Sequence, residues 1–218
     1  MKIEIWSDYR CPFCYIGKRK LELALKEVAL KEDVTMVYKS FELAPDVTQS
    51  YEGTIHQYIA AKYSMALEEA MAMNGRIVNM AAEVGLTYDF EHLKISPSFD
   101  AHRLSHYAKE MGKGAEYTEK VMYAYFTDAK DISKSEVLIE IINEIGLDEV
   151  MARNILGSAL YSEEVRRDEL EARKKGINSV PYFVFNDKEI VSGAQSINVF
   201  KSILNGSVTQ EGGITQIQ

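Results

Sequence analysis

Cysteine is scarce in this 218-residue sequence, which contains only Cys11 and Cys14. It also lacks any stretch near the ~20 apolar residues that cross a bilayer, so we expect no membrane-spanning helix. No dense run of lysine or arginine occurs, and 25 basic against 33 acidic residues give a formal net charge of -8. This balance disfavours nucleic acids and anionic membranes as partners.

The amino-terminal segment carries no pattern of a secretory signal. Residues 1–8 (MKIEIWSD) contain no long apolar run and no cleavage site of small residues. We therefore expect a cytoplasmic protein. In that reducing compartment, two cysteines so close together are more often redox-active or metal-binding than a structural disulfide.

Strand patterns occur at both ends of the chain and helical patterns fill the middle. Ile3 and Ile5 alternate with Trp6, which is typical of a short strand. With a helix over 12–30 and a β-branched and aromatic strand over 34–41, this strand forms a predicted βαβ unit. Residues 54–160 show helical spacing and little strand signal. The remaining predicted elements are a helix over 162–175, a hairpin of 182–185 with 189–192, and a helix over 197–204.

This order indicates an α/β fold with a large inserted α-helical domain, because the sheet needs strands from both ends of the chain to bury its faces. The predicted units are residues 1–48 and 162–205 as the two parts of the sheet domain, 49–161 as the helical domain, and 206–218 as a flexible tail.

Three local motifs bear on where helices begin and end. The segment 133–136 (SKSE) has capping-box spacing, and Asp148 can cap the helix that follows. Asn74 and Gly75 lie inside a helical pattern, which they either break or weaken.

The cysteine pair lies where the first strand ends and the first helix begins. Free backbone N–H groups and the helix dipole favour the thiolate of Cys11 there, and Arg10 adds positive charge. Pro12 suits the first helical position. Cys14 follows one turn later, so the two sulfurs can form a disulfide.

This arrangement predicts thiol–disulfide exchange. Cys11 would form a mixed disulfide with the substrate, and Cys14 would resolve it. Pro12 and Phe13, between the cysteines, should tune the stability of the oxidised form. Asp8 or Glu4 could accept the proton of Cys14, although a solvated or hydrogen-bonded carboxylate is the commoner role of such residues.

A structural zinc site is the main alternative for the cysteine pair. CxxC is half of a four-ligand site, and His102 and His106, four residues apart, could supply the other half. The two halves lie far beyond the spacing of a zinc finger. The strand–CxxC–helix context favours redox chemistry, so we assign no metal and interpret the histidines as surface or interface residues.

Five segments together resemble the DsbA family of thioredoxin-fold proteins, and within it the FrnE-type branch. They are SDYRCPFCYIGK at 7–18, SFELAP at 40–45, DAHRL at 100–104, GINSVPYFVF at 176–185 and GAQS at 193–196. The resemblance covers nearly the whole chain except the tail. It implies a thioredoxin fold with an inserted helical domain.

The resemblance also implies roles for individual residues. Pro181 should be cis and stand beside the cysteines, and the backbone at Val180 should pair with an extended substrate. His102 and Arg103, from DAHRL, would line the cleft or hold the domain interface. The predicted site is therefore Cys11, Cys14 and Pro181 for catalysis, with Pro12, Phe13, Val180, His102 and Arg103 for substrate binding.

The implied activity is dithiol–disulfide exchange, as a reductase or isomerase, on protein disulfides or small thiols. No cofactor is required, and glutathione is a candidate reductant or co-substrate. Relatives with serine at the first cysteine position act as glutathione-dependent 2-hydroxychromene-2-carboxylate isomerases or kappa-class transferases, which is the second hypothesis. A non-enzymatic module stabilised by zinc is the third.

Overall fold

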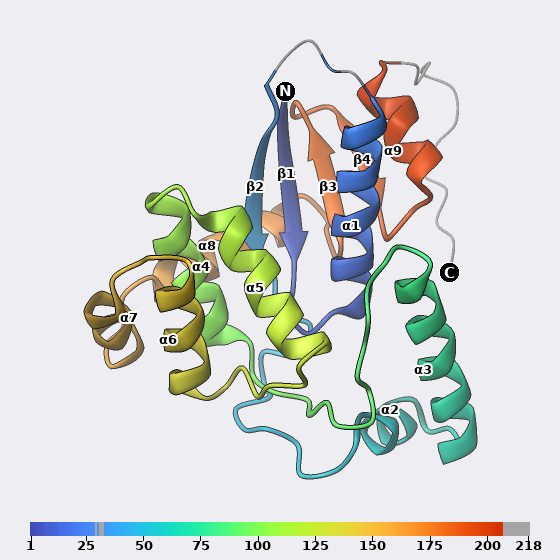
Figure 1. Ribbon diagram of the computed structural model, residues 1–218, viewed down its shortest axis with the longest axis vertical. Coiled ribbons are helices and arrows are strands. Elements are labelled where there is room, and N and C mark those ends of the chain that lie inside the picture. The colour runs from blue at the N-terminus through green and yellow to red at the C-terminus, as the bar shows by residue number, and fades with distance from the viewer. Residues whose placement is uncertain (29, 31–32, 207–218) are drawn as a thin grey trace.

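The computed structural model describes residues 1–28, 30 and 33–206, and within them one four-stranded sheet carries helices on both faces (Figure 1). The elements are β1 Lys2–Ser7, α1 Pro12–Glu27, β2 Thr35–Ser40, α2 Ile55–Tyr63, α3 Leu67–Ala82, α4 Phe99–Glu110, α5 Gly114–Phe126, α6 Ser135–Glu144, α7 Glu149–Leu156, α8 Ser162–Lys174, β3 Tyr182–Phe185, β4 Glu189–Ser192 and α9 Ile197–Leu204.

Both ends of the chain build the sheet, whose strand order is β2-β1-β3-β4. β1 and β2 are parallel and joined through α1, as the predicted βαβ unit requires. β3 pairs antiparallel with β1 on its other side, and β4 completes a hairpin with β3. The α/β fold with an inserted helical region is therefore confirmed, because α2 to α7 fall between β2 and the return to the sheet.

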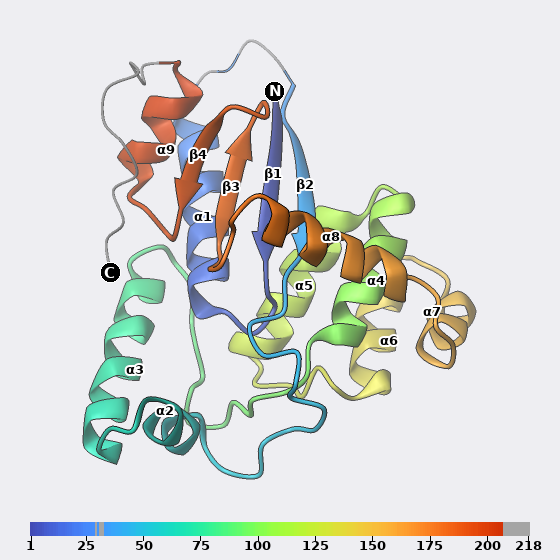
Figure 2. The same cartoon turned by 180° about the vertical axis from the view of Figure 1, so that it is seen from behind.

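The alternation in β1 separates two packing layers. Ile3 and Ile5 are buried against α1 and α9, in a cluster that includes Phe183 and Phe200. Trp6 points to the other face, where its indole N–H donates to the carbonyl of Asp168 in α8 at 3.3 Å. Figure 2 shows α8 crossing this second face, opposite α1. Each face of the sheet is thus covered by helices from distant parts of the chain.

The helical region follows the predicted pattern, with one local difference at the start of α6. α3 runs unbroken through Asn74 and Gly75, because the Asn74 side chain bonds the ring of His56 at 2.9 Å instead of the local backbone. The predicted capping box at 133–136 is wrong. α6 starts at Ser135 with Lys134 as its N-cap, and the Ser133 hydroxyl donates to Asp131. Asp148 caps α7, as expected, by accepting from Val150 N.

Two predicted boundaries were too wide. α1 ends at Glu27 because Val28 has extended backbone angles, so it stops before the expected Leu30. β2 spans Thr35–Ser40 within the expected 34–41. Residues 207–218 of the predicted tail lie outside the described residues. No helix among the described residues has the length and apolar content needed to cross a membrane.

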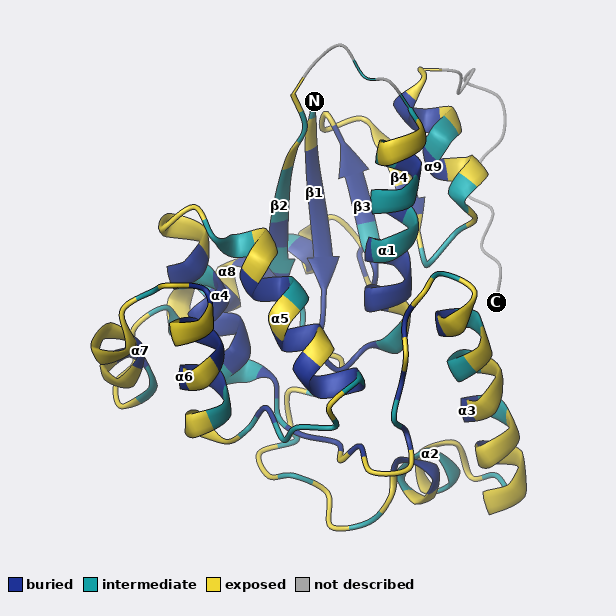
Figure 3. Ribbon diagram, in the orientation of Figure 1, coloured by how far each residue is buried: buried dark blue, intermediate teal, exposed yellow. Residues whose placement is uncertain are grey.

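Burial concentrates where the sheet meets the helical region. Figure 3 shows that β1 and β3 are buried and that α4 and α5, on the β2 side of the sheet, are partly buried, whereas α3 and α7 are mostly exposed. The larger buried cluster contains Trp6, Cys11 and Cys14 together with Tyr117, Phe126 and many aliphatic side chains of the helical region. The cysteine pair is therefore set into the junction between the sheet and the inserted helices.

Candidate active site

The two cysteines occupy the start of α1, as predicted from the sequence. Cys11 is the N-cap residue and Pro12 is the first residue of the helix. The backbone N–H of Cys14 donates to the carbonyl of Cys11 at 3.0 Å, so the two residues are held within one turn. Both are free thiols in the structure. This position gives Cys11 the open N–H groups of a helix amino terminus.

Val180 and Pro181 approach the cysteines from the opposite end of the sequence. The Val180–Pro181 peptide bond is cis, as the resemblance implied. The Cys11 thiol lies 3.5 Å from the carbonyl oxygen of Val180 and donates to it. A Cβ added at Gly17 would meet Pro181 at 3.0 Å, so glycine allows the helix to pack this close. The structure therefore brings together Cys11, Cys14, Val180 and Pro181.

The GAQS segment at 193–196 contacts the backbone of Pro181. Gly193 N–H donates to the carbonyl of Pro181 at 2.8 Å, and Gly193 has a positive φ of 78° that favours glycine. The ammonium group of Lys20, in α1, donates to the carbonyl of Ala194 at 3.1 Å. The contact ties the helix that carries the cysteines to the segment behind Pro181.

Exposure is uneven across the CPFC motif. Cys11 and Cys14 are 3% and 2% exposed, whereas Phe13 between them is 37% exposed. Tyr88, from the loop after α3, covers the motif, since its hydroxyl donates to the Pro12 carbonyl at 2.8 Å and its ring stacks on Tyr15. The thiol of Cys11 is thus less accessible than expected for a nucleophile, and its substrate must contact this loop closely.

The thiol of Cys14 is held in its protonated form. Burial, together with the adjacent Cys11, raises the pKa of Cys14 well above that of an ordinary cysteine. The Ser7 hydroxyl and the backbone N–H of Asp8 act in the opposite direction, because they stabilise the thiolate. Ser7 is the last residue of β1 and is itself buried.

Asp8 is a buried carboxylate with both oxygens in use. Oδ1 accepts from Arg10 N at 3.2 Å, and Oδ2 accepts from Leu43 N at 2.8 Å. Burial opposes its ionisation, but His102, Arg10 and these N–H groups outweigh burial and hold the pKa of Asp8 below its usual value. Glu4, the other acid considered, pairs with Lys2 at 2.9 Å.

Arg10 is directed toward the helical region. Its guanidinium donates to the carbonyl of Ser96 at 3.3 Å, and the residue is 8% exposed. Its positive charge lies beside Asp8, whose pKa it lowers. The positive charge of Arg10, which we expected to act on Cys11, therefore also acts on the carboxylate of Asp8.

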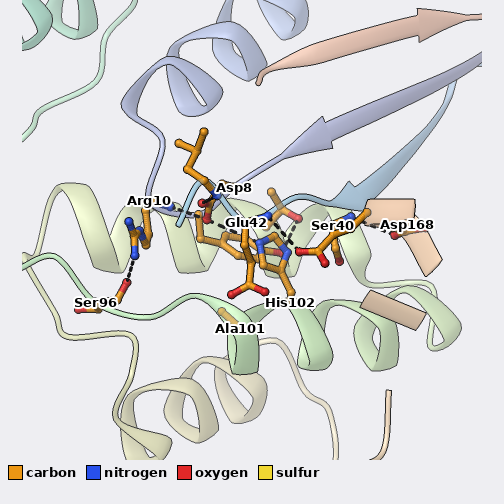
Figure 4. A network of polar contacts seen from close by, with 12 residues as sticks. Asp8, Arg10, Ser40, Glu42, Ser96, Ala101, His102 and Asp168 are labelled. Carbon is orange, nitrogen blue, oxygen red and sulfur yellow. Dashed lines mark hydrogen bonds and ion pairs between the residues drawn. The ribbon is translucent and has the colours of Figure 1, made fainter. Parts of the chain in front are cut away.

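His102 is buried against the segment between β1 and α1 and does not lie in an open cleft. It is 3% exposed, and its Nε2 is 3.6 Å from Oδ1 of Asp8. Within the described part of the chain, that nitrogen has no hydrogen-bond partner. Figure 4 shows His102 close to Asp8 and Glu42, near the ends of β1 and β2. Of the two positions predicted for His102, in the cleft or at the domain interface, the structure places it at the junction of sheet and helices.

Arg103 is not brought to the cysteines. Its guanidinium donates to the carbonyls of Ile155, Ser158 and Leu160, which follow or end α7, and to Asp100. The residue is 4% exposed. These contacts hold the helical region together, and they place Arg103 away from a substrate contact.

The four proposed zinc ligands do not gather into one group. His106 contacts Ser40 and Asp168, at 3.2 and 3.4 Å, whereas His102 faces Asp8. Among the residues that the structure describes, no group of three or more His, Cys, Asp or Glu side chains could hold a metal ion.

Three residues of the site were not identified from the sequence: Ser7, Gly17 and Tyr88. Ser7 and Gly17 lie within the segment SDYRCPFCYIGK, so their position beside CPFC was the available signal. Tyr88 comes from a loop 76 residues away from Pro12 and had no such signal.

Comparison with known proteins agrees with this geometry. The family model for the DSBA-like thioredoxin domain matches residues 2–205. A probable DsbA oxidoreductase from Streptomyces coelicolor is 35% identical in a comparison covering 100% of this chain and 94% of that chain, with a TM-score of 0.90. The uncharacterized protein YwbO of Bacillus subtilis is 28% identical over 93% of this chain and 95% of its own length.

More distant structures share the fold. A 2-hydroxychromene-2-carboxylate isomerase is 15% identical, with 95% and 96% of the two chains covered and a TM-score of 0.71. The cytosolic disulfide reductase DsbM from Pseudomonas aeruginosa, also solved with GSH, is 14% identical, with 95% and 98% covered and a TM-score of 0.67. With a family match over almost the whole chain, this protein belongs to the DSBA-like thioredoxin domain family and has the fold of its thiol oxidoreductases.

Proposed function

We propose that this protein catalyses dithiol–disulfide exchange, with Cys11 as the attacking cysteine and Cys14 as the resolving one. One observation carries the proposal. Two free cysteines lie one helical turn apart at the start of α1, and the sulfur of the first is 3.5 Å from the carbonyl that precedes cis-Pro181. The cap position places Cys11 at the open backbone N–H groups of the helix amino terminus.

The exchange proceeds in two steps. The Cys11 thiolate attacks one sulfur of the substrate disulfide, and the other substrate sulfur leaves as a thiolate. The Cys14 thiol then loses its proton and attacks Cys11 Sγ, which releases the second substrate sulfur and forms the Cys11–Cys14 disulfide. The substrate gains two electrons and the protein loses two. The high pKa of Cys14 protects the mixed disulfide from premature resolution.

The surface around Cys11 supports an extended or flexible substrate. Phe13 is the exposed apolar side chain of the motif, and Pro12 lies beside it. The backbone at Val180 can pair with a substrate segment as an added strand, with Pro181 fixing its direction. We assign these four residues to substrate contact. Protein disulfides and small thiols both satisfy this chemistry.

The direction we propose is reduction or isomerisation in the cytoplasm. A glutathione pool at cytosolic potential keeps many dithiols reduced, so net oxidation of substrates is harder to sustain there. The fold shared with a cytosolic disulfide reductase solved with GSH supports glutathione as the reductant. No other cofactor is needed for the two steps.

Insulin disulfide reduction tests the proposal. The wild-type protein should reduce insulin with glutathione or dithiothreitol as electron donor, and Cys11→Ser should abolish this turnover. Cys14→Ser should keep the first attack and accumulate a mixed disulfide, which mass spectrometry detects. Turnover that survives Cys11→Ser would contradict the assignment, and isomerase turnover that survives Cys14→Ser would favour the glutathione-dependent alternative. A reduction potential measured against glutathione would then fix the direction.

A further inference from the structure

The second step of the exchange, which this inference takes from the proposed function, needs a proton acceptor for Cys14. The thiol is 2% exposed and its pKa is well above the usual value, so bulk water cannot take the proton directly. Asp8 is a poor acceptor, because both of its oxygens already accept backbone N–H groups and its pKa is lowered. Burial raises the pKa of Tyr9 to about 12, so its hydroxyl stays protonated and is no base.

A small cavity lies where the end of β1 meets α4. Its volume is about 10 Å³, which is room for one water molecule, and Ser7 and His102 both line it. The other lining residues are Tyr9, Tyr38, Lys39, Ser105 and Thr118. Five of these seven lining residues carry a hydroxyl group, and such groups are the polar partners that a buried water requires.

Ser7 links this cavity to the thiol. Its hydroxyl stabilises the anionic form of Cys14, and the same residue forms part of the cavity wall. His102 forms another part of the wall, and its Nε2 faces Asp8 at 3.6 Å without a hydrogen-bond partner among the described residues. Because Nε2 faces a carboxylate, it carries the ring hydrogen, which leaves Nδ1 as the ring nitrogen that can accept a proton.

We propose that His102 accepts the proton of Cys14, through the Ser7 hydroxyl and one water in this cavity, as Cys14 attacks the mixed disulfide. The Cys14 S–H bond breaks, a proton is added to the imidazole, and the electron pair left on sulfur forms the bond to Cys11 Sγ. The bond from Cys11 to the substrate sulfur breaks, and that sulfur leaves as a thiolate. No oxidant is consumed beyond the substrate disulfide.

The charges that face His102 favour this role. Asp8 stabilises the imidazolium, as a carboxylate beside a histidine base does in hydrolytic enzymes. Glu42 is a second anion, largely buried, whose carboxylate pairs with Arg166 at 2.6 Å on the solvent side. The titratable and charged groups around the imidazole are Asp8, Tyr9 and Arg10 before α1, Tyr38, Lys39 and Glu42 in and after β2, Arg166 and Glu169 in α8, and Cys14.

A single turnover with 2,2′-dithiodipyridine separates the two steps. The reduced protein releases one pyridine-2-thione when Cys11 attacks and a second when Cys14 resolves the mixed disulfide. We expect His102→Gln to slow the second release by about 10²-fold, the lower end of what a positioned proton acceptor contributes. The first release should keep its wild-type rate. The pH profile of the second release should also differ from that of the wild type, because the proton acceptor has been removed.

Two further variants keep the test decisive. His106→Gln is the matched control, because His106 lies one turn along the same helix but does not line the cavity, and its second release should match the wild type. Ser7→Ala removes the link and leaves the His102–Asp8 pair in place, so it should slow the second release even if His102→Gln does not fold.

The proposal fails if a folded His102→Gln or Ser7→Ala protein resolves the mixed disulfide at the wild-type rate with an unchanged pH profile. A loss of the first release in the wild type would instead contradict the proposed function. Circular dichroism of each variant establishes that it is folded before the rates are compared.

Discussion

Two histidines lie one turn apart on α4, and their surroundings differ. His102 lines a small cavity, and its Nε2 faces a carboxylate oxygen of Asp8 at 3.6 Å. The Nε2 of His106 is 3.2 Å from the Ser40 hydroxyl and 3.4 Å from a carboxylate oxygen of Asp168. Its ring also stacks on Tyr161.

The difference comes from the strand that each histidine meets. β1 ends at Ser7 and continues through Asp8 to the cysteines, so His102 faces the segment that leads to Cys11. β2 ends at Ser40, whose backbone N–H donates to Asp168 at 3.0 Å, so His106 joins a closed set of contacts between sheet, α4 and α8. We infer that His106 contributes to stability and His102 to proton transfer.

The largest expected effect is on the His106 side. Asp168→Asn should lower the free energy of unfolding by about 3 kcal/mol, because it removes one partner of a buried charge cluster. The carboxylate is 3.2 Å from Lys39 and 3.4 Å from His106, and its side chain is 7% exposed. Urea unfolding measures the change.

The separation of roles between the two histidines also predicts that Asp168→Asn leaves the rate of thiol–disulfide exchange unchanged. Folded Asp168→Asn should release the second pyridine-2-thione at the wild-type rate. A slowed second release would mean that the two histidines act as one network, and the division between stability and proton transfer would be wrong. Arg167→Gln is a suitable control for changes on α8, because its side chain is 69% exposed.

Lowering the pH should progressively remove the contribution of Asp168 to the free energy of unfolding. Burial opposes ionisation of this carboxyl, but His106, Ser40 N–H and Lys39 outweigh it and hold its pKa below 3.8. The folded chain therefore binds fewer protons than the unfolded chain near that pH. The stability is complete above about pH 4 and is lost as the pH falls through the folded-state pKa.

The measurement is the difference in unfolding free energy between wild type and Asp168→Asn as a function of pH. The difference should be constant from neutral pH down to about pH 4 and should narrow below it. A difference that instead narrows as pH rises from neutral would assign the stabilisation to a group whose pKa is raised on folding.

Helices and strands could be predicted from the sequence more fully than the contacts between distant side chains. Alternation in β1, the helix after CPFC and the hairpin of β3 and β4 follow from local spacing, and local spacing also identified Cys11 and Cys14. The contacts of Ser40 with Asp168 join residues 128 positions apart, and no local pattern encodes such a pairing. The failed capping box at 133–136 shows the same limit on a small scale, because Asp131 competed for Ser133.

The smallest expected effect compares two serines at strand ends. Ser40→Ala should cost about 1 kcal/mol of unfolding free energy, the usual value of one hydrogen bond, because it removes the hydroxyl that contacts His106 and leaves the backbone N–H bond to Asp168. Its second thione release should be unchanged, whereas Ser7→Ala should slow that step. Equal kinetic effects from both serines would show that the end of β1 has no special connection to Cys14.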